Sequence, residues 1–153
     1  MLDLDILRIL VSFTGAFAFS LLFNLKGKRL LFASLGGLLC GVVFYLTSLI
    51  SEREAFRYLF ASIAVTLYAE VIARILKSPM TCFLSSGIIP LVPGEALYRS
   101  MSAALHGNLD AFFNYGMEAI YISLSIAAGI LLISPIKSIV LQMFPKTRGK
   151  QKG

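Results

Sequence analysis

The sequence has few charged residues for its length. Only 14% of its 153 residues are charged, whereas 58% are hydrophobic and the mean hydropathy is +0.83. A soluble domain carries about 25% charged residues, which keep its surface in water. The shortage excludes an ordinary soluble domain and predicts one integral membrane domain over residues 1–153.

Residues suited to catalysis and metal binding are also scarce. The one histidine, His106, lies in a polar connection, and Cys40 and Cys82 lie inside apolar runs without metal-ligand spacing. Thiols in such runs behave as small hydrophobes. Ser85, Ser86 and His106 leave an intramembrane hydrolase as a remote alternative, but no G-x-S-x-G motif accompanies them. We therefore predict no enzyme activity, no metal site, no cofactor and no disulfide.

Four stretches are long and apolar enough to cross a bilayer, which takes about 20 helical residues. They are residues 6–25, 30–50, 56–76 and 117–136, and an interrupted fifth stretch covers residues 82–104. The first stretch resembles a cleaved signal segment, but Asp3 and Asp5 stand where such a segment needs positive charge. We expect an all-α integral membrane protein with about five transmembrane helices, the first one retained.

The placement of lysine and arginine favours five crossings over four. Short cytoplasmic loops collect these residues. With five crossings, ten of the fourteen lysines and arginines lie on one side of the membrane. If residues 82–104 do not cross, the two sides receive eight and six. The ten are Lys26, Lys28, Arg29, Arg74, Lys77, Lys137, Lys146, Arg148, Lys150 and Lys152. This predicts an outside N-terminus and a basic cytoplasmic tail over 137–153. Lysine and arginine that flank membrane segments on the cytoplasmic side of the lipid bilayer account for the net charge of +6. We therefore expect no nucleic-acid partner.

Small residues recur at four-residue spacing in the second stretch. Ala33, Gly37 and Gly41 form this series. Such spacing lets helix backbones approach closely in a membrane. Ordinary glycine frequency in membrane helices is an equally good explanation of the same residues.

The interrupted stretch reads SGIIPLVPGEALYRS from Ser86 to Ser100. Each proline inside a helix removes a hydrogen bond, so Pro90 and Pro93 followed by Gly94 predict a break in the helix. Irregular backbone within a membrane is tolerated only where protein buries it or where it lines a watery cavity. We therefore expect the break to face something polar.

Beyond the break, residues 95–105 are expected to restart as a half-helix with unpaired N–H groups. Such an N-terminus attracts carboxylates, as in many transporters. Glu95 and Arg99 lie four apart on one face, with Tyr98 beside them. The predicted substrate-binding residues are Pro90, Pro93, Gly94, Glu95, Tyr98 and Arg99. The alternative is a simple kink or hairpin bend whose charges are satisfied by water.

Two further acids are weaker candidates. Glu70 and Arg74 are also four apart, near the cytoplasmic end of the third stretch, where a snorkelling pair is favoured over a proton carrier. Glu70 is therefore a weak ion-coupling candidate beside Glu95. Glu118 opens the last stretch and is expected to be an interfacial acid or an acid of the first helical turn.

The segment IIPLVPGEALYRSMSAALHGNLDAF resembles the small-subunit type of the threonine/serine exporter (ThrE-like) family. The shared element is P-L-V-P-G at residues 90–94, followed by Tyr98 and a glycine-acid step at Gly107 and Asp110. Two residues separate Gly107 from Asp110, where the family has the acid closer. The segment LLFNLKGKRLLFASLGG, with Asn24 before a basic turn, is a weaker match.

The resemblance implies a multi-pass protein of a bacterial inner membrane. It also implies a larger companion membrane subunit, and export of threonine and serine or, in some relatives, of a dicarboxylate such as succinate. Ion-coupled alternating access, including antiport, and an oligomer are expected on the same basis. A non-transporting membrane scaffold or assembly protein is the alternative from a different class.

Overall fold

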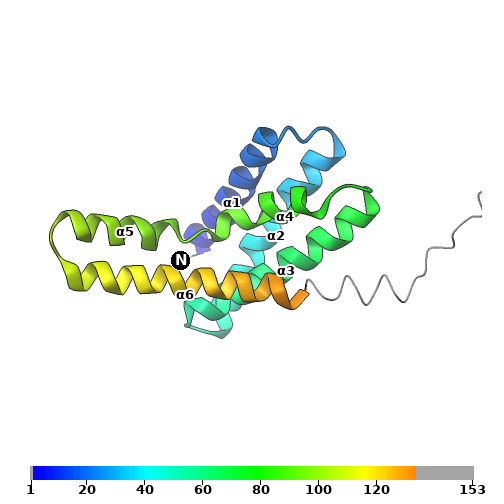
Figure 1. Cartoon of the computed structure of the whole chain (residues 1–153). Helices are drawn as coiled ribbons and strands as arrows, with labels where there is room; N and C mark the ends of the chain where they lie inside the picture. The colour runs from blue at the N-terminus through cyan, green and yellow to red at the C-terminus, as the bar shows by residue number, and fades with distance from the viewer. Residues whose placement is uncertain (1, 134–153) are drawn as a thin grey trace, which may run out of the picture.

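The computed structural model describes residues 2–133, which fold into helices without a strand (Figure 1). The elements in chain order are α1 (Leu2–Leu22), α2 (Lys28–Ile50), α3 (Glu54–Ile75), α4 (Met80–Ile88), the short 3-10 helix η1 (Ile89–Leu91), α5 (Gly94–Leu105) and α6 (Leu109–Ile133). The predicted tail 137–153 and the end of the last predicted segment, 134–136, lie outside the described residues. The all-α prediction is confirmed.

Three helices, α2, α3 and α6, are long and apolar enough to cross a membrane, and α4 to α5 adds a fourth span if the bent pair counts as one. The described apolar part of α1, Ile6–Leu22, is shorter than the other spans. Large apolar side chains such as Leu10, Leu49 and Leu131 are exposed on the outside of these helices. Exposed apolar surface on this scale suits lipid, so the chain is an all-α integral membrane protein.

The glycines of α2 pack against neighbouring helices. A Cβ at Gly37 would overlap the methyl group of Ala16 on α1, and one at Gly41 would lie 3.2 Å from the Ile9 Cα. Gly36 lies against Gly87 of α4. The small-residue series is therefore a true packing face, which brings α1 and α4 close to α2.

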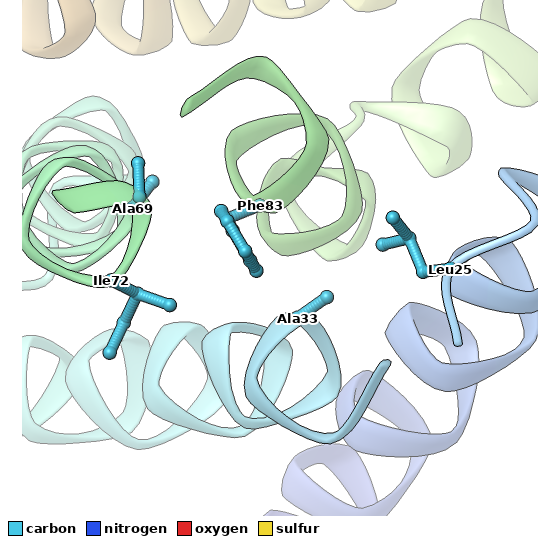
Figure 2. Packing of buried hydrophobic residues seen from close by; sticks show 6 residues of the cluster. Leu25, Ala33, Ala69, Ile72 and Phe83 are labelled. Atoms are coloured by element: carbon cyan, nitrogen blue, oxygen red, sulfur yellow. The ribbon is translucent and has the colours of Figure 1, made fainter. Parts of the chain in front are cut away.

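One hydrophobic cluster fills the space between α2, α3 and α4. Phe83 of α4 is fully buried and lies among Ala33 of α2 and Ala69 and Ile72 of α3, with Leu25 of the α1–α2 connection closing the other side (Figure 2). The small side chains of Ala33 on α2 and Ala69 on α3 leave room for the aromatic ring of Phe83. The cluster fixes α4 against the bundle and so positions the break that follows α4.

The predicted helix break is confirmed and lies between η1 and α5. Pro90 continues the helical path as part of η1, and the chain then turns at Val92 and Pro93, where Gly94 N–H donates to the Val92 carbonyl at 2.7 Å. The two parts, Met80–Leu91 and Gly94–Leu105, are bent by 51°. The bend directs α5 away from the α1–α4 bundle, where it packs on α6 (Figure 1).

The turn between α5 and α6 is shorter than the sequence indicates. Residues 106–116 were expected to be a polar connection, but α6 begins at Leu109 rather than near residue 117. Gly107 takes a positive φ of 71° that ends α5, and the Asn108 side-chain oxygen accepts a hydrogen bond from Ala111 N–H at 3.1 Å. That bond is a helix N-cap. The polar residues after Asn108 therefore lie on a helical extension of the last segment.

Candidate functional site

The break lies against one end of the bundle. The residues that line the space around it come from the start of α3 (Glu54 and Tyr58), from the first half of α1 and from the last turns of α2. At about 1.5 Å per residue, Tyr58 is only about 6 Å along α3 from its first residue. The sequence places the break at the middle of a membrane segment. In the fold, Leu91 just before the turn packs with Cys40 and Val65 near the middle of α2 and α3, whereas the turn itself lies beside Glu54 and Tyr58 at the start of α3.

Two clefts flank the broken helix. The first, of about 430 Å³, lies between the break, α3, α5 and α6, and we name it the acidic cleft because Glu54, Glu95 and Glu118 line it. The second, of about 490 Å³, lies between α1, α2, α3 and η1, and we name it the arginine cleft because Arg8 and Arg57 line it. Both volumes are in the usual range for small-molecule sites.

Five of the six predicted substrate-binding residues line these clefts. Pro93, Gly94, Glu95 and Arg99 line the acidic cleft, and Pro90 and Glu95 line the arginine cleft. The sixth, Tyr98, is 74% exposed on the outer face of α5 and lines neither cleft. The fold thus brings the break and the ion pair together and leaves the tyrosine outside.

Arg99 is held by two contacts. Its Nη2 donates to Glu95 Oε1 at 2.6 Å, and its Cζ lies 5.7 Å from the centre of the Tyr115 ring on α6. The contact with Tyr115 is a cation–π interaction across the α5–α6 pair. Arg99 is 53% exposed and Glu95 77% exposed, so this pair is accessible from the cleft.

The start of α5 offers backbone donors. Leu97 N–H donates to the Pro93 carbonyl at 3.1 Å, but the N–H groups of Glu95 and Ala96 have no backbone acceptor within residues 2–133. No side chain caps this helix among the described residues. Because Ala96 is buried and lines the acidic cleft, the positive end of α5 contributes to that cleft.

Sequence reasoning missed part of the site. Glu54, Tyr58 and Tyr115 were not among the predicted residues. Glu118 lies inside α6 rather than in its first turn, and it lines the acidic cleft with Glu54. The positions Glu54 and Tyr58 are four apart, as are Glu95 and Arg99. A search for polar residues at that spacing near helix ends would have found the α3 pair, because such residues share one helix face.

The remaining candidates lie elsewhere. Glu70 accepts from Arg74 Nη2 at 2.7 Å, as predicted for a local pair, and lines neither cleft. Ser86 is buried and donates to its own helix at the Cys82 carbonyl, at 3.2 Å, while His106 is exposed at the far end of α5. The residues of the hydrolase alternative are therefore not grouped in either cleft. Within residues 2–133, no group of histidine, cysteine, aspartate or glutamate is arranged to hold a metal ion.

Comparison with protein families gives one match. The model of the family described as threonine/serine exporter, ThrE, matches residues 8–136. The chain belongs to the threonine/serine exporter family. No curated protein and no solved structure matches it. As a member of a transporter family with several apolar helices, the chain is a multi-pass membrane protein of the exporter type.

The family-like element maps onto the site. The P-L-V-P-G residues form η1, the turn and the first residue of α5. Gly107 ends α5 with its positive φ, and Asp110 lies in the first turn of α6, away from both clefts. Of the residues that carry the resemblance, only those around the break line a cleft.

Proposed function

We propose that this chain is the small subunit of a two-component secondary exporter in a bacterial inner membrane. It would export small carboxylate-bearing solutes, above all threonine and serine, by ion-coupled alternating access. The single observation that carries the proposal is the broken helix, which opens an acidic cleft at Glu95 and Arg99 beside unpaired amides of α5. Transporter sites use this combination of unwound backbone and half-helix N-terminus.

Each site residue has a part in the proposal. Val92 and Pro93 form the turn, Pro90 lies in η1 just before it, and Gly94 begins α5, whose start faces the solute in this proposal. Glu95 and Arg99 are free to exchange their mutual contact for a contact with the solute, because both are accessible. Glu95 also serves as the main candidate for ion coupling, with Glu70 as a weaker one.

The exposed outer face of α5 supports a companion subunit. Large exposed apolar patches mark sites for lipid or for a protein partner. In this chain α5 packs mainly on α6, and its face away from Arg99 carries exposed apolar residues, among them Leu97 and Met101. We propose that a larger membrane subunit of the same family covers this face and completes the enclosure.

Solute export from cells tests the proposal. Cells of the source organism that lack this gene are complemented with the wild-type chain, loaded with labelled threonine, serine or succinate, and followed for efflux. We expect faster efflux of threonine and serine than in uncomplemented cells. Faster efflux of succinate alone would favour the dicarboxylate alternative, and unchanged efflux of all three would contradict a transport role.

The scaffold alternative is separated by a double variant. If the break only shapes a docking surface, Glu95→Gln with Arg99→Gln would leave efflux intact. If the pair contacts the solute, the same variant abolishes efflux while the protein accumulates in the membrane at its normal level. Glu52→Gln is the matched control, because Glu52 is exposed and lines neither cleft.

A further inference from the structure

The arginine cleft is not used by the function proposed above, apart from Pro90 and Glu95 at its edge. It lies on the far side of the broken helix from the acidic cleft and has a volume of about 490 Å³. Its walls come from α1, α2, α3, η1 and the first turn of α5, so five separate elements line it. A cavity of this size and construction is suited to a small molecule.

The hydrogen-bond donors in this cleft are available to an anion. Arg57 is half-buried, its Nε donates to the Ser51 carbonyl at 2.9 Å, and it forms no ion pair with a residue in 6–133, the part of the chain whose side chains are described. This bond orients the guanidinium group and leaves its terminal nitrogens for another acceptor. Arg8 and the hydroxyl-bearing Tyr45 and Tyr58 line the same cleft. Arginine binds carboxylates with two parallel hydrogen bonds, which favours such a ligand here.

The formal charges distinguish the two clefts. Among the lining residues of 6–133, Arg8 and Arg57 balance Glu54 and Glu95 in the arginine cleft, which gives two positive and two negative charges. The acidic cleft has Arg99 against Glu54, Glu95 and Glu118, which gives one positive and three negative charges. A carboxylate is repelled by an excess of negative charge. The arginine cleft is therefore the more favourable place for the carboxylate of an amino acid, whereas the acidic cleft favours its ammonium group.

We infer that the arginine cleft is a second solute-binding chamber, in which Arg8 and Arg57 bind the carboxylate group of a small solute. This rests on the proposed function, since it takes the chain to transport such solutes. Glu54, Tyr58 and Glu95 line both clefts, so these three residues separate the two chambers. In this proposal the solute passes Glu95 when it moves from one chamber to the other.

Inside-out membrane vesicles from the complemented cells test this inference, because export becomes uptake. Labelled threonine is the substrate, and unlabelled threoninol, which lacks the carboxylate, is the competitor. The variants are Arg57→Gln, Arg57→Lys and Arg53→Gln. Arg53 is the matched control because it is the residue just before α3, is exposed and lines neither cleft.

For Arg57→Gln we expect the KM for threonine to rise roughly tenfold, because a charged hydrogen-bond donor to the carboxylate is lost. Inhibition by threoninol should stay at its wild-type level, since this competitor offers no carboxylate. Arg57→Lys keeps the charge but loses the bidentate geometry, so its KM for threonine should lie between those of the wild type and Arg57→Gln. Arg53→Gln should behave as wild type.

Two results would overturn the inference while leaving the proposed function standing. One is an unchanged KM for threonine in Arg57→Gln at normal membrane abundance. The other is an equal loss of threonine uptake and threoninol inhibition, which would mean that Arg57 has only a structural role. If wild-type vesicles take up neither threonine nor serine nor succinate, the proposed function itself fails, and the inference fails with it.

Discussion

Arg99 Nη2 lies 2.6 Å from Glu95 Oε1 at the start of α5, and the chain contains a second pair of the same spacing, Glu70 and Arg74, at 2.7 Å. The two pairs differ in their surroundings. The Glu95 side chain is 77% exposed beside a helix break, whereas that of Glu70 is 15% exposed on the unbroken α3. The first pair is placed to exchange partners with a solute, and the second is a local contact on a regular helix.

Neutralising Arg99 should therefore affect transport more than stability. An exposed pair contributes little to the folded state, so Arg99→Gln should unfold at nearly the wild-type temperature in detergent. Efflux of the transported solute should fall roughly tenfold, because a charged donor to the solute is removed. Thermal unfolding and efflux are measured on the same variant, and a large drop in Tm with unchanged specific efflux would refute this assignment.

Restoring the helix at the break should reduce transport. Pro93→Ala restores a backbone N–H group at position 93, four residues after Ile89. In the wild-type structure the Ile89 carbonyl accepts a hydrogen bond from Val92 N–H at 3.2 Å. The chain should then straighten, since the proline no longer prevents helical bonding. Spin labels on α4 and α5 would report a change in the distance across the bend of 51°.

Pro90→Ala is the matched control for that measurement. Pro90 lies within η1, before the turn, and its replacement should leave the bend as it is. If both variants keep the wild-type distance, proline is not what holds the break open. If Pro90→Ala straightens the chain and Pro93→Ala does not, the break is set one turn earlier than the structure places it.

The elements of this fold follow from sequence patterns to different extents. The break was predictable because Pro90, Pro93 and Gly94 act on the backbone that contains them. The G-x-x-x-G face of α2 was predictable as a surface, but its partner was not, because Ala16 belongs to another helix. The position of Glu118 at the start of the last helix was wrong, because Asn108 starts α6 earlier than composition indicates and this extends the helix beside α5.

The residues of the acidic cleft could not be predicted from local sequence patterns alone. Glu54 is one polar residue at a helix start, and Tyr115 is one aromatic residue in a polar run. They become part of a site only because the bend of α5 and the packing of α6 on α3 bring them to Glu95. Contacts between separate helices depend on tertiary packing, which the local spacing of residues does not specify.

The contact between α1 and α2 leaves no room for a side chain at Gly37. A Cβ there would overlap Ala16 and lie 2.7 Å from the Ser12 carbonyl oxygen, so Gly37→Ala should destabilise the fold by about 1–3 kcal/mol. Gly15→Ala, in open space on α1, should be neutral or stabilising by about 0.5–1 kcal/mol. Equal stability of the two variants would mean that these helices do not pack closely.

That measurement can use the chain's own thiols. Cys40 is buried at 1% exposure and becomes reactive toward a maleimide dye only when the protein unfolds. Cys82 is partly exposed, so Gly37→Ala and Gly15→Ala are made in a Cys82→Ser background. The temperature at which Cys40 is labelled then reports unfolding in detergent or in native membranes.

Gly129 connects the packing of α6 to the acidic cleft. A Cβ at Gly129 would overlap the Ser62 hydroxyl and lie 2.9 Å from the Leu59 carbonyl oxygen, whereas a Cβ at Gly116 would make an ordinary contact with Ser100 at 3.4 Å. Gly129→Ala must therefore push α6 away from α3, and this separates Glu118 from Glu54. We expect Gly129→Ala to lose both stability and efflux, and Gly116→Ala to keep both. Retained efflux in a destabilised Gly129→Ala would show that transport does not depend on the approach of α6 to α3.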